Sequence, residues 1–251
     1  MESWMQNGRL VELSIIVPCL NENDNLPIIL PKLANLILAN SLNAELVILD
    51  DASTDDTYRL AERIMSQHTE IKWSLYQRHE PRRGYGAIMR FGLAHAIGRY
   101  AIPVSADDVD PIDVIPVFLE HMRNGADLVQ CSRYSRPKDA ETIPFKYKFY
   151  QTIYRALVKF LIGQEIRDST YSFKMHNRIL MMAVGLSSNR FSISPEITFK
   201  TLLTGGKIVY VPGSQGVRIY GISKFKFLRE GPGFAWVLFR AALHRLGILW
   251  F

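Results

Sequence analysis

The sequence predicts an α/β fold in which a mostly parallel β-sheet is covered by helices on both faces. Short, almost continuously apolar segments alternate with segments of helical spacing through the first half of the 251 residues. The apolar segments lack the polar–apolar alternation of a half-exposed sheet, so we expect them to be buried on both sides. With 48% hydrophobic residues, the chain can form one large core.

The expected elements follow in chain order. Apolar runs bounded by polar or turn residues predict strands at 13–18, 45–50, 71–77, 100–104, 126–132 and 207–212, and the loop at 167–178 leads into a further short strand. Helical spacing predicts helices at 25–39, 53–67, 85–98, 111–125, 144–163 and 194–206. Pro27 suits the first turn of the first helix, and Ser53 with Asp55 suits the start of the second.

A basic and aromatic tail follows from residue 226. Its aromatic and aliphatic residues are mixed with Arg240, His244 and Arg245, which is typical of a helix at a membrane interface; packing on the domain or on a partner is the alternative. We therefore expect a domain at 1–225 and an amphipathic helical tail at 226–251. No apolar stretch reaches the ~20 residues of a spanning helix, and we expect no secretory signal at the N-terminus.

The formal net charge of +6 predicts a negatively charged partner. An anionic membrane surface and a phosphorylated substrate both fit. We expect no nucleic-acid partner, because acidic residues gather where the strands end and would repel a phosphate backbone. Cys19 and Cys131 each lie in an apolar strand, so we expect two core residues and no disulfide.

Polar clusters follow four of the expected strands: "PCLNEND", "DDASTDD", "ADDVDP" and "SRYSR". Parallel strands end at one edge of their sheet, and ligands of such sheets bind at that edge, so the clusters predict one site. Carboxylates there can accept hydrogen bonds from a base or a ribose. The stretch "RRGYGA" offers glycines at a helix start, which suits either a phosphate or an ordinary turn.

The order and spacing of these blocks resemble those of family 2 glycosyltransferases. The blocks are "SIIVPCLNENDNL", "ELVILDDASTDDT", "RRGYGAIMRFGL", "ADDVDP" and "DLVQCSRY". The later blocks "RDSTYSFKMHNR", "SPEITFKTLL" and "VRIYGISKF" resemble the branch that transfers sugars to dolichol phosphate or polyprenyl phosphate. The resemblance runs from Leu13 to Phe225 and implies the GT-A fold, a Rossmann-like sheet that binds a nucleotide sugar.

The resemblance implies a nucleotide-sugar site at the first clusters. The base and ribose are expected at Asp51, and the glycine turn is expected near the sugar nucleotide. A helix-capping turn is the alternative for Asp50, and an ordinary turn is the alternative for Gly84. The implied donor-site residues are Pro18, Asn21, Glu22, Asp50, Asp51, Gly84, Ala106 and Asp107.

A hard divalent cation, Mg²⁺ or Mn²⁺, is expected at the cluster "VSADDVDP", because a departing nucleoside diphosphate needs its charge neutralised. The family pattern is Asp-x-Asp, and this chain has Ser105 at the first position. We expect Asp107 to be a metal ligand, helped by Asp108 or Asp110. A helix cap before Pro111 is the alternative for Asp110.

The later blocks imply an acceptor-phosphate site. A surface position is the alternative for its basic residues, and a turn-stabilising role is the alternative for its aspartate. If the acceptor were a hydroxyl, Glu196 or Asp168 would be the candidate general base, whereas a phosphate is already anionic and needs none. The implied acceptor-site residues are Arg133, Lys148, Asp168, Arg218 and Lys224.

The sequence thus predicts an inverting, metal-dependent transferase that moves mannose or glucose from GDP-mannose or UDP-glucose to a polyprenyl phosphate. We expect Asp107, Arg133 and Arg218 to be catalytic. We expect a peripheral protein at the cytoplasmic face of a membrane, where a small anchoring subunit or a second copy can bind it. Two alternatives stay open: a transferase that extends a glycan at a sugar hydroxyl, and an inactive nucleotide-sugar-binding subunit, which Ser105 favours.

Overall fold

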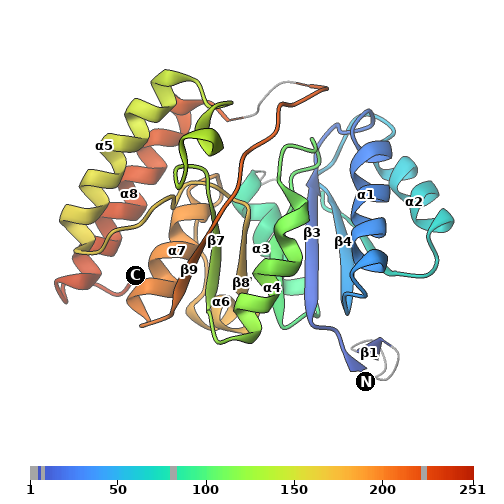
Figure 1. Ribbon diagram of the computed structural model, residues 1–251, viewed down its shortest axis with the longest axis horizontal. Helices are drawn as coiled ribbons and strands as arrows, with labels where there is room; N and C mark the ends of the chain where they lie inside the picture. Colours follow the sequence, from blue (N-terminus) through green and yellow to red (C-terminus); the bar gives the residue numbers. More distant parts are fainter. Residues whose placement is uncertain (1–4, 7–8, 80–83, 222–224) are drawn as a thin grey trace.

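Seven strands of the computed structural model form one sheet in the order β5-β4-β3-β6-β8-β7-β9 (Figure 1). The structure describes residues 5–6, 9–79, 84–221 and 225–251. All pairings in this sheet are parallel except those of β8, which runs antiparallel between β6 and β7, so the expected mostly parallel sheet is confirmed. The strands are β3 (Leu13–Cys19), β4 (Ala44–Asp50), β5 (Lys72–Gln77), β6 (Tyr100–Pro103), β7 (Leu128–Ser132), β8 (Lys174–Asn177) and β9 (Ile208–Pro212); β1 (Met5–Gln6) and β2 (Arg9–Leu10) pair separately.

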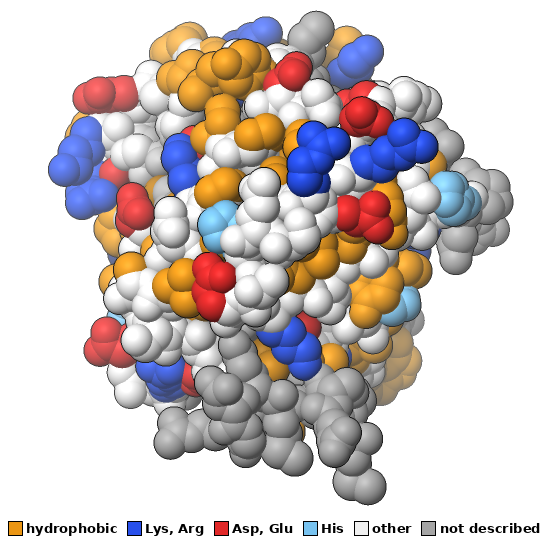
Figure 2. All heavy atoms as spheres, turned by 90° about the vertical axis from the view of Figure 1, so that its right-hand side faces the viewer, with side chains coloured by type: hydrophobic (Ala, Val, Ile, Leu, Met, Phe, Trp, Pro, Cys, Tyr) orange, Lys and Arg blue, Asp and Glu red, His pale blue; other side chains and the backbone are white. Residues whose placement is uncertain are grey.

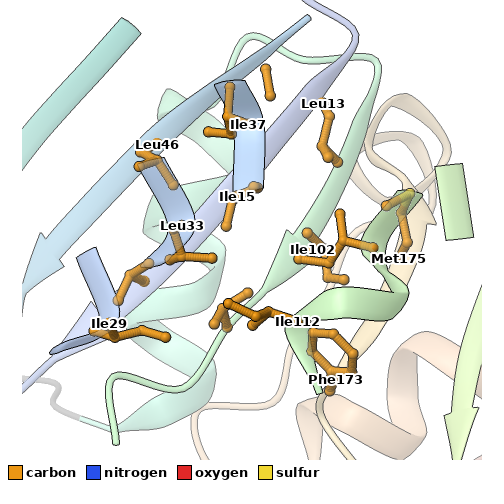
Figure 3. Close-up of a cluster of buried hydrophobic side chains, with 14 of the residues drawn as sticks. Leu13, Ile15, Ile29, Leu33, Ile37, Leu46, Ile102, Ile112, Phe173 and Met175 are labelled. Carbon is orange, nitrogen blue, oxygen red and sulfur yellow. The ribbon is translucent and has the colours of Figure 1, made fainter. Parts of the chain in front are cut away.

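Helices cover both faces of the sheet. One face packs against α1 (Leu26–Ala39), α2 (Thr57–Gln67) and α4 (Ile115–Arg123), and the other packs against α3 (Tyr85–His95), α6 (Arg178–Val184) and α7 (Ile193–Leu203). Figure 3 shows the first of these cores, where side chains of β3, β4 and α1 meet others from β6 and β8. Neighbouring residues of β3, such as Ile15 and Ile16, point into opposite cores, which explains why the strand is mostly apolar on both faces.

Three helices differ from the expected ones. α2 begins at Thr57, because Asp55 accepts from the amide of Thr57 at 3.0 Å and forms a turn before the helix. The helix expected at 111–125 divides into a 3-10 turn, Ile112–Val114, and α4; a second 3-10 turn spans Pro137–Ala140. α6 has no counterpart among the expected helices. Asn177 caps it through the amide of Leu180 at 3.2 Å, a signal that the sequence does contain.

The remaining two helices, α5 (Phe145–Ile162) and α8 (Phe227–Arg245), lie side by side at one end of the molecule (Figure 1). Their inner sides pack with α7 in a third core that includes Val158, Phe199 and Val237. Their outer sides expose large apolar side chains, namely Phe145, Phe149, Phe160, Leu228, Trp236 and Phe239. Nowhere in the described ranges does a helix combine the length and the apolar character needed to cross a membrane.

The opposite end of the molecule, around α1 and α2, has a mixed charged surface. Figure 2 faces this end and shows acidic and basic side chains interspersed with polar and apolar ones. On α2, Arg59, Glu62 and Arg63 are all exposed. The two ends of the sheet are therefore covered by helices of different surface chemistry.

Candidate active site

The polar clusters lie along one edge of the sheet. β3, β4, β6 and β7 all run in the same direction, so the loops 20–25, 51–56, 104–111 and 133–136 follow their carboxyl ends at this edge. Pro18 lies within β3 beside Leu49 of β4. The segment 213–221 leaves β9 and continues along the same edge toward β3 (Figure 1). The sheet therefore brings the predicted donor and acceptor residues to one side of the molecule.

Hydrogen bonds join the first two of these loops. The amide of Asn21 donates to Ser53 Oγ at 2.9 Å, and Asn21 Oδ1 accepts from the amide of Thr54 at 2.8 Å. The amide of Glu22 donates to Thr57 Oγ1 at 2.8 Å. Asn21 adopts a left-handed conformation, with φ of 54°, which asparagine tolerates better than most residues. The predicted donor-site residues that follow β3 are thus joined by hydrogen bonds to the loop that follows β4.

Asp50 and Asp51 have different surroundings. Asp50 is fully buried and accepts from the amide of Ser53 at 3.1 Å and from Gln77 Nε2 at 2.8 Å. The bond to Ser53 closes a turn before α2 and the bond to Gln77 joins the residue to β5, so this carboxylate is engaged within the protein. Asp51 is 5% exposed and pairs with Arg78, which is buried directly after β5. Arg78 is absent from the predicted site, although a basic residue just after a strand end is a usable signal.

Gly84 and Gly86 begin α3 against the loop 188–190. A side chain on Gly84 would lie 2.5 Å from Asn189 O, and one on Gly86 would lie 2.7 Å from Arg190 O. The amide of Ala87 also donates to Asn189 O at 3.1 Å. The backbone of the loop 188–190 lies so close to the start of α3 that both positions require glycine. Gly84 also has a φ of 136°, a backbone conformation that glycine adopts more readily than other residues. A contact within the protein, rather than a phosphate, is sufficient to explain this glycine pair.

The adjacent acids Asp107 and Asp108 point in different directions. Asp107 forms an ion pair with Arg218, while its other oxygen, Oδ1, is buried and has no hydrogen-bond partner among the described residues. Asp108 has a φ of 58°, and its side chain pairs with Lys32 of α1. Of these two acids, Asp107 is therefore the one with a carboxylate oxygen that has no hydrogen-bond partner among the described residues.

Asp110 is turned toward the protein interior. It is buried and accepts from the amide of Ser105 at 2.7 Å and from the hydroxyl of Tyr171 at 2.6 Å. The described parts of the chain contain no group of three histidines, cysteines or acids that could hold a metal ion. Asp108 and Asp110 each have a protein partner elsewhere, so their help to Asp107 in binding a metal stays a prediction.

A single carboxylate nevertheless suits Mg²⁺ or Mn²⁺ at a nucleotide. Mg²⁺ is usually held by one or two carboxylates together with the phosphates of the substrate. Burial raises the pKa of Asp107 above its ordinary value, Arg218 lowers it, and the charges of Asp110 and Glu22 raise it again. A cation would relieve this repulsion among carboxylates, and the unpartnered Oδ1 of Asp107 is an atom that can bind one.

Arg133, directly after β7, is held from several sides. Its Nε donates to Asp168 Oδ2 at 2.8 Å and its Nη2 to Asp168 Oδ1 at 3.3 Å, a bidentate pair with a fully buried carboxylate. The guanidinium lies 4.2 Å from the ring centre of Tyr171. Burial acts to lower the pKa of Arg133, but Asp168 raises it above its ordinary value. Asp168 therefore positions a basic side chain.

The segment 213–221 contacts both Arg133 and Asp107. Gln215 Oε1 accepts from Arg133 Nη1 at 3.1 Å, and Arg218 pairs with Asp107. The backbone of this segment is held as well, since the amide of Gly216 donates to Val109 O at 2.7 Å. The predicted metal ligand and the predicted phosphate-binding arginine thus share one neighbouring segment.

Three further predicted site residues are Ala106, Lys148 and Lys224. Ala106 is buried at 4% exposure beside Asp107. Lys148 is partly exposed on α5, on the side of the molecule that carries the apolar helices. Lys224 lies outside the described residues.

Glu196, considered as a general base for a hydroxyl acceptor, is engaged inside the protein. It is fully buried, and its two oxygens accept from the amides of Ser187 and Ser188, each at 2.8 Å. Lys200 Nζ lies 3.3 Å away. Burial acts to raise the pKa of Glu196, but these partners lower it below its ordinary value, so the carboxylate stays charged in place.

Residues 14–185 match the family model described as Glycosyl transferase family 2. The chain belongs to this family. A dolichol-phosphate mannosyltransferase of Pyrococcus furiosus is 29% identical over 226 residues, which cover 86% of this chain and 60% of that protein. A prophage bactoprenol glucosyl transferase homolog of Escherichia coli is 27% identical over 217 residues, which cover 86% of this chain and 67% of that protein. The resemblance read from the sequence blocks is confirmed.

A solved structure confirms the expected GT-A-like fold. Glucosyl-3-phosphoglycerate synthase of Mycobacterium tuberculosis, in complex with Mn²⁺, uridine diphosphate and glucosyl-3-phosphoglycerate, superimposes with a TM-score of 0.64 over 98% of this chain and 87% of that one. The sequence identity is 19%, so this similarity concerns the fold. The chain spans 60% of the length of the Pyrococcus relative, which therefore has a substantial part outside the match.

Proposed function

We propose that this chain transfers a hexose, mannose or glucose, from a nucleotide sugar to a polyprenyl phosphate, with inversion at the anomeric carbon. The observation that carries the proposal is Arg133, which a buried aspartate holds at the carboxyl end of β7 while one neighbouring segment contacts both it and Asp107. The names of the relatives, a dolichol-phosphate mannosyltransferase and a bactoprenol glucosyl transferase homolog, fit such an acceptor.

The nucleotide sugar, GDP-mannose or UDP-glucose, lies in this proposal across the carboxyl ends of β3, β4 and β6. Asp51 is the acid better suited to accept hydrogen bonds from the base or ribose, because it is 5% exposed whereas Asp50 is fully buried and accepts from Ser53 and Gln77. Asp107 would hold Mg²⁺ or Mn²⁺, which neutralises the charge of the departing diphosphate when bound. The M. tuberculosis neighbour, which shares this fold, is named with Mn²⁺ and uridine diphosphate.

Arg133 and Arg218 bind the acceptor phosphate in this proposal. The bidentate pair with Asp168 fixes the fork of Arg133, and the neutral Gln215 on its Nη1 is a partner that an anionic phosphate can replace. The phosphate oxygen attacks the anomeric carbon in line while the nucleoside diphosphate leaves from the opposite side. The contribution of the arginines is positioning and electrostatic stabilisation.

A phosphate acceptor is favoured over a sugar hydroxyl, because a hydroxyl needs a general base. Both acids considered for that role have other partners: Asp168 holds Arg133, and Glu196 accepts from two backbone amides. A phosphate is already ionised and needs no base.

The outer sides of α5 and α8 suit the surface of a bilayer, so the proposal includes a peripheral position at the cytoplasmic face of a membrane. Leu228 is 90% exposed and Trp236 59% exposed on α8, and Phe149 is 55% exposed on α5. Basic residues on the same helices, such as Lys148 and Arg229, can meet anionic headgroups. A small anchoring subunit or a second copy of the chain is the alternative partner for this surface.

Partitioning of a labelled product tests the reaction. The purified protein, with Mn²⁺ or Mg²⁺ and a short-chain polyprenyl phosphate, receives labelled GDP-mannose, UDP-glucose or UDP-N-acetylglucosamine in separate reactions. We expect label in the organic phase with one donor and none with a chelator. Metal-dependent release of free sugar without organic-phase label would refute the lipid acceptor. No reaction with any donor would favour an inactive binding subunit.

The substitution Asp107→Asn tests the metal ligand. It removes the charge while keeping the size of the side chain, so we expect turnover to be almost abolished and the fold to remain intact. Asp108→Asn, one residue away but paired with Lys32, is the matched control and should retain most of the activity. Normal turnover by the Asp107 variant would refute the assignment.

A further inference from the structure

Helix α7 is buried on all sides although it carries several polar residues. Every residue from Ile193 to Thr201 is buried. Ile193 and Ile197 pack in the core under the sheet, and Phe199 packs against α5 and α8. Buried polar groups require hydrogen bonds, and those made by Ser194, Glu196 and Thr198 involve two loops near the candidate site. One loop is 187–190, at the start of α3, and the other is 168–171, beside Arg133.

Lys174 connects α7 to the loop 168–171. It is fully buried at the start of β8, and its Nζ donates to Ser169 O, Ser194 O and Thr198 Oγ1, each at 2.9 Å. Three acceptors match the three hydrogens of an ammonium group; burial lowers the pKa of Lys174 well below its ordinary value, whereas Asp168 favours this charged form. The hydroxyl of Ser194 adds a bond to Tyr171 O at 2.9 Å. The loop is therefore fixed to α7 at two of its carbonyl groups.

This loop carries the two residues that surround Arg133. Asp168, whose next residue is the partner of Lys174, accepts from Arg133 Nε at 2.8 Å. The ring of Tyr171 lies 4.2 Å from the guanidinium. The Ser169 carbonyl also accepts from Ser194 Oγ at 3.1 Å, so loss of the Lys174 bond would weaken the anchoring of the peptide between Ser169 and Thr170. The position of Asp168, and with it the orientation of Arg133, thus depends in part on the lysine through Ser169.

Glu196 makes the corresponding connection to the loop 187–190. Its oxygens accept from the amides of Ser187 and Ser188, each at 2.8 Å, and from Ser187 Oγ at 2.9 Å. The next residue, Asn189, accepts through its carbonyl oxygen from the amide of Ala87 at 3.1 Å. The glycine turn that begins α3 therefore contacts a loop whose backbone is hydrogen-bonded to Glu196.

The two connections leave α7 on opposite sides. Ser194 and Thr198 are one helical turn apart, and so are Glu196 and its neighbour Lys200. A step of two residues in an α-helix turns the side-chain direction by more than half a circle, so the second pair faces away from the first. A disturbance of one connection can therefore leave the other intact.

We propose that Lys174 and Glu196 are positioning residues with separate targets: Lys174 sets Arg133 on the acceptor side, and Glu196 sets the start of α3 on the donor side. The assignment of the two sides rests on the proposed function. The loop contacts themselves do not depend on it, which allows the two ideas to be tested apart.

Mild substitutions test the separation without removing a buried charge. Thr198→Val removes one partner of Lys174, and Ser187→Ala removes one partner of Glu196. The matched control is Thr201→Val, a buried threonine of the same helix whose hydroxyl bonds to Ile197 O at 2.9 Å.

Amide hydrogen exchange measures the loops directly. We expect Thr198→Val to raise the exchange rate of residues 168–171 about tenfold, the effect of one hydrogen bond to a charged group, and to leave 187–190 unchanged. Ser187→Ala should do the reverse, and Thr201→Val should change neither loop. Equal effects of both variants on both loops, or effects no larger than those of the control, would overturn the proposal.

Kinetics then test the assignment to acceptor and donor. We expect Thr198→Val to raise the half-saturating concentration of a short-chain polyprenyl phosphate several-fold, and Ser187→Ala to raise that of the nucleotide sugar. If the two loops respond separately in hydrogen exchange but the protein turns over no nucleotide sugar, the proposed function is refuted. The proposal that Lys174 and Glu196 position separate loops would still hold. Turnover with both constants shifted equally in each variant would refute the separate targets.

Discussion

Replacing Asp168 with asparagine removes the charge that holds Arg133. Asp168 is fully buried and accepts from Arg133 Nε at 2.8 Å, from Thr170 Oγ1 at 3.2 Å and from the amide of Tyr171 at 3.3 Å. Asparagine has the same shape, but it leaves the guanidinium without a counter-charge. Removing one partner of a buried pair costs about 3–5 kcal/mol. The Arg133 side chain is 15% exposed, so we expect the lower value, about 3 kcal/mol.

Urea unfolding, followed by circular dichroism, measures this loss. At a slope of roughly 2 kcal/mol per molar urea, the midpoint should fall by about 1.5 M. The double variant Arg133→Met with Asp168→Asn lacks both charges, and it should recover at least half of the loss. A single variant that loses less than about 1 kcal/mol, or a double variant no more stable than the single one, would refute the reasoning.

Three other substitutions, two of them with a comparison variant, probe a buried histidine, a packed glycine and the exposed helical surface. Burial lowers the pKa of His176 to about 4 from 6.5. As the pH falls, His176 therefore gains its proton at a higher pH in the unfolded chain than in the folded one. The unfolding free energy should fall by about 3 kcal/mol as the pH drops from 6.5 to about 4. In His176→Phe this share of the pH dependence should disappear from urea titrations, and its persistence would contradict a neutral buried ring. Gly86→Ala should cost about 1–3 kcal/mol in thermal unfolding, whereas Gly231→Ala, where an added Cβ meets nothing within 4 Å, should stabilise α8 by about 1 kcal/mol. Trp236→Glu should weaken sedimentation with anionic vesicles about tenfold, whereas Leu38→Glu on α1 should not; equal effects would exclude α8 as the binding surface.

The strands and the family could be predicted because both depend on local sequence. A strand buried on both faces is mostly apolar on both, so β3, β4 and β7 stand out as largely apolar runs. Ile15 and Ile16 illustrate the reason, since each fills a different core. The blocks that follow these strands identified the family because their order and spacing along the chain can be read directly from the sequence.

Side-chain directions at the site could not be predicted, because distant residues decide them. Asp110 is turned inward by Tyr171, which is 61 positions away in the chain. Asp108 points to Lys32, 76 positions away, from a left-handed backbone that no neighbouring glycine indicates. The spacing of three acids in four positions therefore does not indicate that their protein partners lie in three different parts of the fold.

The position of β7 has a consequence for how the molecule is assembled. Its neighbours in the sheet are β8 and β9, both of which come later in the chain, whereas β3, β4, β5 and β6 can pair as soon as residue 103 has been synthesised. On the ribosome, β7 must wait for residues 174–177 and 208–212 before its edges are covered. The nascent chain therefore passes through a stage in which β3 to β6 have paired and β7 has unpaired backbone groups. At that stage the protein is most exposed to aggregation and most in need of a chaperone.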